Sequence, residues 1–234
     1  MSASPFVIPQ PPRPVIAVAD AGGFFPVRRI WCVGRNYLDH IRELGNDERA
    51  PPFFFAKHAD MIEADGAVIP YPPLTRDLHH EVELIVAMKS GGLRIPADTA
   101  LNRVYGYAVG IDLTRRDLQN AARKQELPWE IAKSFDHAAP CGALQPAAKI
   151  GHPSKGRIWL TVNGREAQSG DLAQMIWNVP EIISRLSQQV ALDAGDIIMT
   201  GTPAGVSALV PGDRIECGCD GVDTLTVTIG RAAV

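Results

Sequence analysis

The sequence predicts an α+β domain built around a rolled or sandwiched mixed sheet. The chain of 234 residues holds 19 prolines and 21 glycines, which divide it into short pieces. Most of these pieces are rich in β-branched and aromatic residues, as strands are. Only three stretches have a helical pattern. Many short strands with few helices are typical of this fold class.

The predicted strands follow one another along the whole chain. They cover residues 27–33, 53–57, 67–70, 79–88, 104–113, 157–162, 197–200, 214–217 and 224–229. The pair Asn163-Gly164 after one of them is a hairpin signal. The predicted helices cover residues 37–44, 115–125 and 179–189. Thr114 and Asp117 have capping-box spacing at the start of the second helix, and Pro180 falls in the first turn of the third.

Composition limits the possible partners. Hydrophobic residues make up 46% of the chain and charged residues 21%, enough to build a core. The formal net charge of -3 argues against nucleic acid or an acidic membrane surface as the main partner. No apolar run approaches the roughly 20 residues of a membrane span.

The length fits one large domain with a short extra segment. We expect residues 1–26 to form an extended Pro-rich N-terminal segment and residues 27–234 to form a single domain. The N-terminus lacks the basic and apolar regions of a signal peptide, so we expect a cytoplasmic protein. The four cysteines lack a zinc-site pattern and are expected to stay reduced in or near a core.

Two acids stand at the head of the strongest strand signal, residues 79–88. Residues i and i+2 of a strand share a face and lie roughly 7 Å apart, so Glu81 and Glu83 are neighbours. Beyond these acids both faces are apolar, which is typical of a strand covered on both sides. Buried carboxylates are costly unless a cation compensates them.

A third acid, Asp112, lies near the end of the predicted strand 104–113. One face of that strand carries Gly106, Ala108, Gly110 and Asp112, and these small side chains would let another element approach closely. If Asp112 meets Glu81 and Glu83, three carboxylates converge. All-oxygen ligation suits a hard divalent ion, Mg²⁺ first, with Mn²⁺ or Ca²⁺ as substitutes. The alternative is that the glutamates pair with basic side chains such as Arg115 or Arg116.

Other polar residues fit the same chemistry, although each also has a simpler interpretation. His40 and Glu43 share a helix face, where a carboxylate can orient a histidine that activates water; a solvated surface pair is the alternative. Arg116 and Gln119 also share a face, which suits either substrate binding or an exposed helix surface. Lys133 lies in an apolar stretch, where it either extends toward solvent or stabilises a developing negative charge.

Five motifs in order resemble the fumarylacetoacetate hydrolase family. They are Gly34-Arg35-Asn36-Tyr37 with His40 and Glu43, His79-His80-Glu81-Val82-Glu83, residues 110–117, Lys133-Ser134-Phe135, and residues 200–206 with Thr202. The resemblance covers residues 27 to 230. It is closest to the short bacterial members that act on fumarylpyruvate in gentisate-type aromatic degradation.

The resemblance implies the sandwich roll of the family's C-terminal domain and a homodimer. It implies Mg²⁺ or Mn²⁺ held by Glu81, Glu83 and Asp112, and a catalytic His40–Glu43 dyad. With these residues we expect Lys133 to assist catalysis. Arg116, Gln119 and Thr202 are expected to hold a small 2-oxo acid.

The expected reaction is metal-dependent hydrolysis of a C–C bond in a 2,4-dioxo acid, fumarylpyruvate giving fumarate and pyruvate. Three alternatives within the family are an acylpyruvate hydrolase, an oxaloacetate decarboxylase and a 2-oxo acid isomerase-decarboxylase. An alternative from another class is a non-catalytic scaffold that the metal stabilises.

Overall fold

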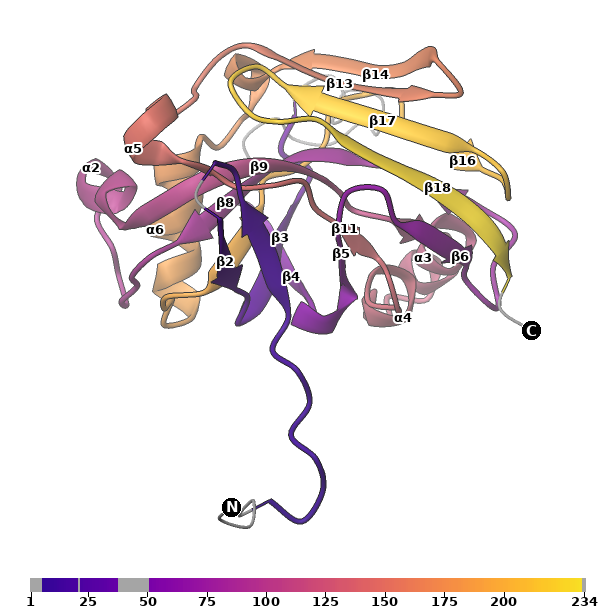
Figure 1. Ribbon diagram of the computed structural model, residues 1–234, viewed down its shortest axis with the longest axis horizontal. Coiled ribbons are helices and arrows are strands. Elements are labelled where there is room, and N and C mark those ends of the chain that lie inside the picture. Colours follow the sequence, from indigo (N-terminus) through magenta and orange to yellow (C-terminus); the bar gives the residue numbers. More distant parts are fainter. Residues whose placement is uncertain (1–5, 21, 38–50, 233–234) are drawn as a thin grey trace.

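Two β-sheets packed face to face form the centre of the protein in a computed structural model that describes residues 6–20, 22–37 and 51–232. The six-stranded sheet has the order β12 (Gln145–Pro146), β9 (Val104–Ile111), β8 (Val82–Met88), β15 (Asp196–Met199), β3 (Arg29–Gly34) and β4 (Phe53–Lys57). The five-stranded sheet has the order β14 (Arg165–Asp171), β13 (Arg157–Val162), β17 (Arg214–Cys219), β18 (Leu225–Ala232) and β6 (Val68–Tyr71). Figure 1 shows β13, β14 and β17 as a layer above β8 and β9.

The predicted α+β sandwich with a mixed sheet is confirmed. The strand β15 pairs parallel with β3 and antiparallel with β8, and β18 pairs parallel with β6. Small sheets join β1 (Val15–Val18) to β2 (Gly23–Pro26), β11 (Ala139–Pro140) to β5 (Ile62–Glu63), and β7 (Leu78–His79) to both β10 (Thr114–Arg115) and β16 (Ala208–Leu209).

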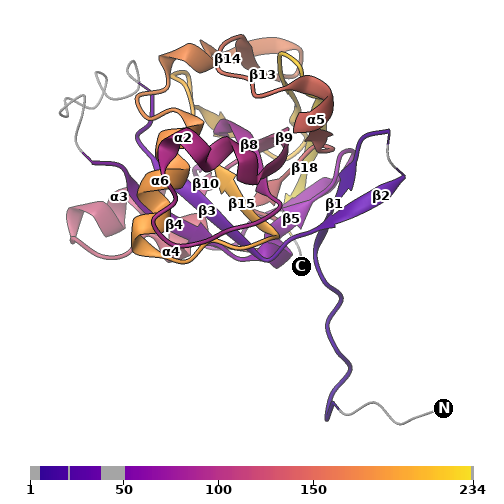
Figure 2. The same ribbon diagram turned by 90° about the vertical axis from the view of Figure 1, so that its left-hand side faces the viewer.

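Helices are few and mostly short among residues 6–20, 22–37 and 51–232. They are α2 (Ala97–Ala100), α3 (Arg116–Lys124), α4 (Glu130–Lys133), α5 (Ala147–Ile150) and α6 (Val179–Gln189), with 3₁₀ turns η1 (Ala59–Met61), η2 (Leu101–Arg103) and η3 (Leu172–Gln174). Figure 2 shows α2 and α6 together beside the six-stranded sheet. None of the helices in the described part of the chain has the length and apolar character needed to cross a membrane.

The strand β8 is buried along its whole length. All seven of its residues are buried, because β9 and β15 pair with its two edges and other elements cover its faces. The expectation of a strand covered on both sides is therefore met. Burial of this strand brings the two acids at its head out of bulk water.

The small side chains of β9 allow close packing, as the alternation predicted. A Cβ at Gly106 would lie 2.3 Å from the carbonyl oxygen of Gln145, and one at Gly110 would lie 2.9 Å from that of Pro140. Both distances are shorter than van der Waals contact permits. Glycine at these positions therefore lets the chain segment 139–146 lie directly against β9, the strand that Asp112 immediately follows.

Three local features differ from the expectations. Within the segment 1–26, β1 and β2 form a hairpin whose Ile16 and Phe25 join the core, so part of it is more structured than an extended lead-in. The division of the chain at residue 26 stays a prediction. Thr114 belongs to β10 and does not cap α3. Asp117 instead accepts hydrogen bonds from the Thr75 hydroxyl and the Arg76 amide, since these distant groups compete successfully for its carboxylate.

Candidate active site

The three acids lie together where the neighbouring strands β8 and β9 of the six-stranded sheet begin and end. Glu81 immediately precedes β8, Glu83 lies opposite Gly110 in the β8–β9 pair, and Asp112 immediately follows β9. The amide of Asp112 donates to the carbonyl oxygen of Glu81 at 2.8 Å. One ligand oxygen from each of the three carboxylates lies within 4.8 Å of the others. The pairing register of β8 and β9 thus creates the predicted cluster.

Cationic side chains surround two of these acids. The Nζ atom of Lys133 lies 2.7 Å from Oε2 of Glu81 and 2.7 Å from Oδ2 of Asp112, and Lys133 is only 3% exposed. Arg116 forms an ion pair with the other oxygen of Glu81. The Nζ atom of Lys57 lies 2.9 Å from Oδ1 of Asp112, without hydrogen-bond geometry.

The alternative, in which the glutamates pair with basic side chains, applies to Glu81, which pairs with Arg116. It does not hold through Arg115, whose guanidinium lies 4.4 Å from the ring centroid of Phe135.

The ion pairs shift the pKa values of the groups they join. Burial alone raises the pKa of Glu81, but Lys133 and Arg116 outweigh it and lower that pKa to about 2. Burial alone lowers the pKa of Lys133, but Asp112 and Glu81 outweigh it, so its pKa is raised. Lys133 is therefore a fixed positive charge at neutral pH.

Glu83 has the opposite environment. Burial, together with the negative charges of Asp112 and Glu81, raises its pKa well above the ordinary value. Its carboxylate accepts a hydrogen bond from the Gly201 amide at 2.7 Å, but no cation of the described residues forms an ion pair with it. The site therefore favours an additional positive charge beside Glu83.

The donor set fits a hard divalent ion. All three candidate ligands are carboxylates, and no histidine or cysteine of the described residues joins the cluster. Two oxygen donors are suited to such an ion: the carboxylate of Glu83, which has no cationic partner among the described residues, and the Oδ1 atom of Asp112, which is near Lys57 but accepts no hydrogen bond. Three protein ligands leave coordination positions for water or a substrate.

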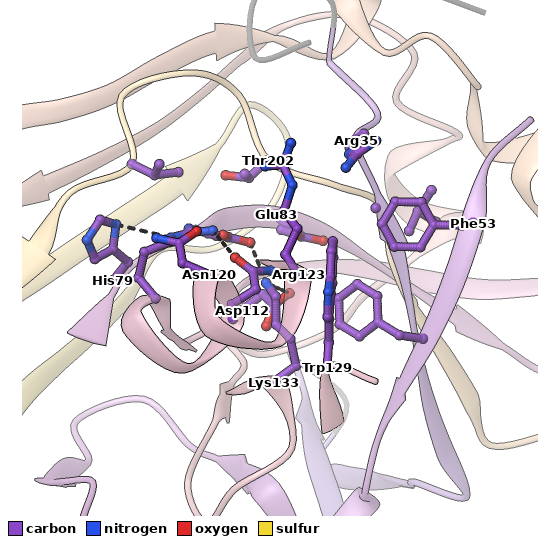
Figure 3. Close-up of a pocket in the computed structure, with 17 residues that line it drawn as sticks. Arg35, Phe53, His79, Glu83, Asp112, Asn120, Arg123, Trp129, Lys133 and Thr202 are labelled. Atoms are coloured by element: carbon purple, nitrogen blue, oxygen red, sulfur yellow. Dashed lines mark hydrogen bonds and ion pairs between the residues drawn. The ribbon is translucent and has the colours of Figure 1, made fainter. Parts of the chain in front are cut away.

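A cavity of about 280 Å³ opens above the acids. It is lined by Glu81, Glu83, Asp112 and Lys133 together with all three predicted substrate-binding residues, Arg116, Gln119 and Thr202. Figure 3 shows Glu83 and Asp112 in the middle of this pocket, with Arg35 and Phe53 on one side and His79 on the other. Arg116 donates to the side-chain oxygen of Gln119, as their shared helix face predicted. The Gln119 amide nitrogen is left to donate.

A buried amide holds Thr202 in one orientation. The Val82 amide donates to Oε1 of Gln168 at 3.0 Å, and Nε2 of Gln168 donates to the Pro203 carbonyl oxygen at 2.9 Å. These two backbone groups determine which end of the amide is the donor. Nε2 also lies 2.8 Å from Oγ1 of Thr202, so that hydroxyl oxygen is an acceptor. The Thr202 proton is then available to an acceptor in the cavity.

Two of the predicted catalytic residues cannot be placed. His40 and Glu43 lie outside the described residues, so their roles stay predictions. Several residues at the site were not identified from the sequence: Arg35 and Trp129 line the cavity, and Lys57 forms an ion pair with Asp112. A lysine that ends an aromatic strand was a usable signal for Lys57, and Arg35 lies inside one of the quoted motifs.

Comparisons with known proteins agree with the predicted family. The model of the fumarylacetoacetate hydrolase C-terminal family matches residues 29–230. The chain is 41% identical to fumarylpyruvate hydrolase of Ralstonia sp, over 77% of this chain and 93% of that protein. It is 40% identical to the mitochondrial oxaloacetate tautomerase of Rattus norvegicus, over 88% of this chain and 97% of that protein.

A solved structure gives the same result in three dimensions. The crystal structure of fumarylpyruvate hydrolase from Pseudomonas aeruginosa, in complex with Mn²⁺ and pyruvate, superposes with a TM-score of 0.94 at 43% identity. The match covers 97% of this chain and 99% of that one. With its sequence, its fold and its clustered acids in agreement, the chain belongs to the fumarylacetoacetate hydrolase family.

Proposed function

We propose that this protein is a metal-dependent hydrolase that cleaves the C–C bond of a 2,4-dioxo acid, converting fumarylpyruvate to fumarate and pyruvate. The observation that carries the proposal is the buried cluster of three carboxylates with Lys133 at the base of the cavity. The related hydrolase from Pseudomonas aeruginosa, whose structure contains Mn²⁺ and pyruvate, supports it.

The proposed metal site consists of Glu81, Glu83 and Asp112. Mg²⁺ is the proposed native ion, and Mn²⁺ or Ca²⁺ would substitute for it, because all three accept carboxylate oxygen ligands. A bound divalent ion would act as a Lewis acid toward the oxygens of the 2-oxo acid.

Charge balance supports an anionic substrate. When all three carboxylates are ionised, the charges of Lys57, Lys133 and Arg116 cancel theirs. A divalent ion would then leave the site with excess positive charge. A substrate whose 2-oxo end carries one carboxylate and develops a second negative charge during C–C cleavage would neutralise it.

Lys133 is suited to a role in catalysis. Two of its three N–H donors are used by Glu81 and Asp112, which leaves one for a developing oxyanion. We propose that His40, oriented by Glu43, removes a proton from the water that attacks the distal keto carbon. The electron pair of the broken bond passes to the pyruvate fragment, which leaves as its enolate and then takes up a proton.

The substrate-binding residues would hold the acid by complementary donors. Gln119 has amide N–H groups left after its oxygen accepts from Arg116, and the Thr202 hydroxyl proton is available because Gln168 donates to its oxygen. Arg116 adds positive charge at the wall of the cavity. These groups suit the carboxylate and keto oxygens of a 2-oxo acid.

A second candidate is an oxaloacetate tautomerase, and the 40% identity to the Rattus norvegicus protein favours it. The two functions differ in substrate and in the need for water attack. The test is kcat/KM for fumarylpyruvate, for an acylpyruvate and for both oxaloacetate tautomers with Mg²⁺ or Mn²⁺. Hydrolysis of fumarylpyruvate that exceeds oxaloacetate tautomerisation in kcat/KM is the expected result. Tautomerisation alone would replace the hydrolase proposal.

The proposal also includes a place in gentisate-type aromatic degradation, a cytoplasmic location and a homodimer. An extended arm, residues 6–14, leaves the body of the protein and carries the exposed side chains of Val7 and Ile8, which a second copy could cover (Figure 1). Light scattering after size-exclusion chromatography measures the dimer. A monomer across the micromolar range would contradict this part of the proposal.

A further inference from the structure

Two arginines line the cavity without a carboxylate partner among the described residues. Arg35 and Arg123 belong to the same cavity as the acid cluster. The ion pairs of the described chain involve other basic side chains. Burial and the neighbouring charge of Arg123 lower the pKa of Arg35, so the two guanidinium groups repel each other. An anion between them would remove this repulsion.

The backbone is shaped to place Arg35 in the cavity wall. A Cβ at Gly34 would lie 2.0 Å from the ring of Phe53, so only glycine lets this ring lie against the end of β3. The next residue, Arg35, has a φ of 59°, a left-handed conformation that is uncommon outside glycine. Its guanidinium carbon lies 5.7 Å from the centroid of Phe53. Such backbone strain tends to concentrate at functional sites.

Helix α3 carries two of the arginines that line the cavity. Arg116, which pairs with Glu81, is in its first turn, and Arg123 is seven residues later. Seven residues of α-helix rise about 10 Å. An extended seven-carbon dioxo acid spans about 7–8 Å between its carboxyl carbons, because each of its six C–C bonds, about 1.5 Å long, advances the zigzag chain by only about 1.25 Å. Such an acid placed with its 2-oxo end at the acid cluster would bring its second carboxylate toward Arg123.

We propose that Arg35 and Arg123 form the subsite for the distal carboxylate of the substrate, so that the substrate class is a long dicarboxylic 2,4-dioxo acid. Guanidinium groups bind carboxylates through paired hydrogen bonds. The rings of Phe53 and Trp129, with centroids 5.2 Å apart, provide an apolar wall for the planar acyl chain. A four-carbon dicarboxylate such as oxaloacetate is too short to bridge both ends. This subsite rests on the proposed function.

The test compares substrates with and without the distal carboxylate. In Arg123→Gln and Arg35→Gln, kcat/KM for fumarylpyruvate should fall about 10- to 100-fold, mainly through KM, as expected for a lost charged hydrogen bond. For acetylpyruvate, which lacks that carboxylate, the change should stay below about threefold. Arg35→Lys should recover part of the loss. Lys124→Gln, an exposed change on the same helix, is the matched control.

Two outcomes would overturn the subsite. Equal losses on both substrates would show that the arginines bind the 2-oxo acid end, which both substrates share, or that they stabilise the fold. Unchanged kinetics on both substrates would show that the arginines do not bind substrate. A wild-type protein inactive on both substrates would reject the proposed function instead. Calorimetry of fumarate binding to the wild type and to Arg123→Gln then tests the subsite independently of turnover. Binding to the variant that is at least tenfold weaker supports the subsite, and equal binding rejects it.

Discussion

Replacing Lys133 with methionine tests how the acid cluster is stabilised. Methionine keeps the length and apolar stem of the side chain but removes the ammonium that lies 2.7 Å from both Glu81 and Asp112. Breaking a buried ion pair costs about 3–5 kcal/mol. Because Glu81 keeps Arg116 and Asp112 keeps Lys57, we expect the lower end, a loss of about 3 kcal/mol in the free energy of unfolding without metal.

The same substitution should improve metal binding. Lys133 repels a divalent ion beside it, and the variant would retain the three carboxylates without that repulsion. We expect Mn²⁺ to bind at least about tenfold more tightly, which is about 1.4 kcal/mol. The loss of a donor to the developing oxyanion should nevertheless lower kcat by about 10²–10³-fold at saturating metal. Stability and metal affinity therefore change in opposite directions.

Urea unfolding, with the metal removed by EDTA or added in excess, measures the stability of the variant. Calorimetry measures Mn²⁺ affinity, and turnover of fumarylpyruvate measures kcat. Lys155→Met removes an exposed lysine and is the control for the loss of one positive charge. An unfolding free energy within about 0.5 kcal/mol of wild type without metal would refute the reasoning, since surface substitutions have effects of that size. Unchanged Mn²⁺ affinity would refute the proposed repulsion.

Three further predictions concern the proton, the substrate and the Thr202 turn. Because the pKa of Glu83 is raised, a metal ion must displace its proton to bind. Mn²⁺ affinity should therefore rise by up to about tenfold per pH unit and level off above that pKa. A calorimetric affinity that stays constant from pH 5 to 8 would contradict this. Mn²⁺ and oxalate should each tighten the binding of the other by the same factor in calorimetric titrations, and independent binding would reject the charge-balance argument. Gln168→Leu leaves the Val82 amide unpaired and should lower the free energy of unfolding, measured by urea unfolding, by about 2–4 kcal/mol. The control Gln188→Leu, at an exposed glutamine, should leave that free energy unchanged.

Much of the fold could be predicted because its long strands carry their own signal. The strand β8 is apolar on both faces beyond its acids, and α6 begins with a capping box between Asn178 and Glu181 at the predicted position. Two-residue strands such as β10 and β16 have no such pattern, since only pairing with β7 defines them. The capping box expected at Thr114 failed for the same reason: residues distant in sequence satisfy Asp117.

By itself the sequence determined which acids share a strand face and where they lie along the chain. The side-chain alternation of a strand places Glu81 and Glu83 on one face, and Asp112 at the end of a row of small residues. Local geometry is enough for this, because it depends only on neighbouring residues.

Only the tertiary structure decided how the acids are compensated. The β8–β9 register brings Asp112 to the two glutamates, and α4 brings Lys133 between Glu81 and Asp112. No basic side chain within the described ranges pairs with Glu83. Charge compensation acts through space over a few ångströms, so it depends on which distant segments the fold makes neighbours.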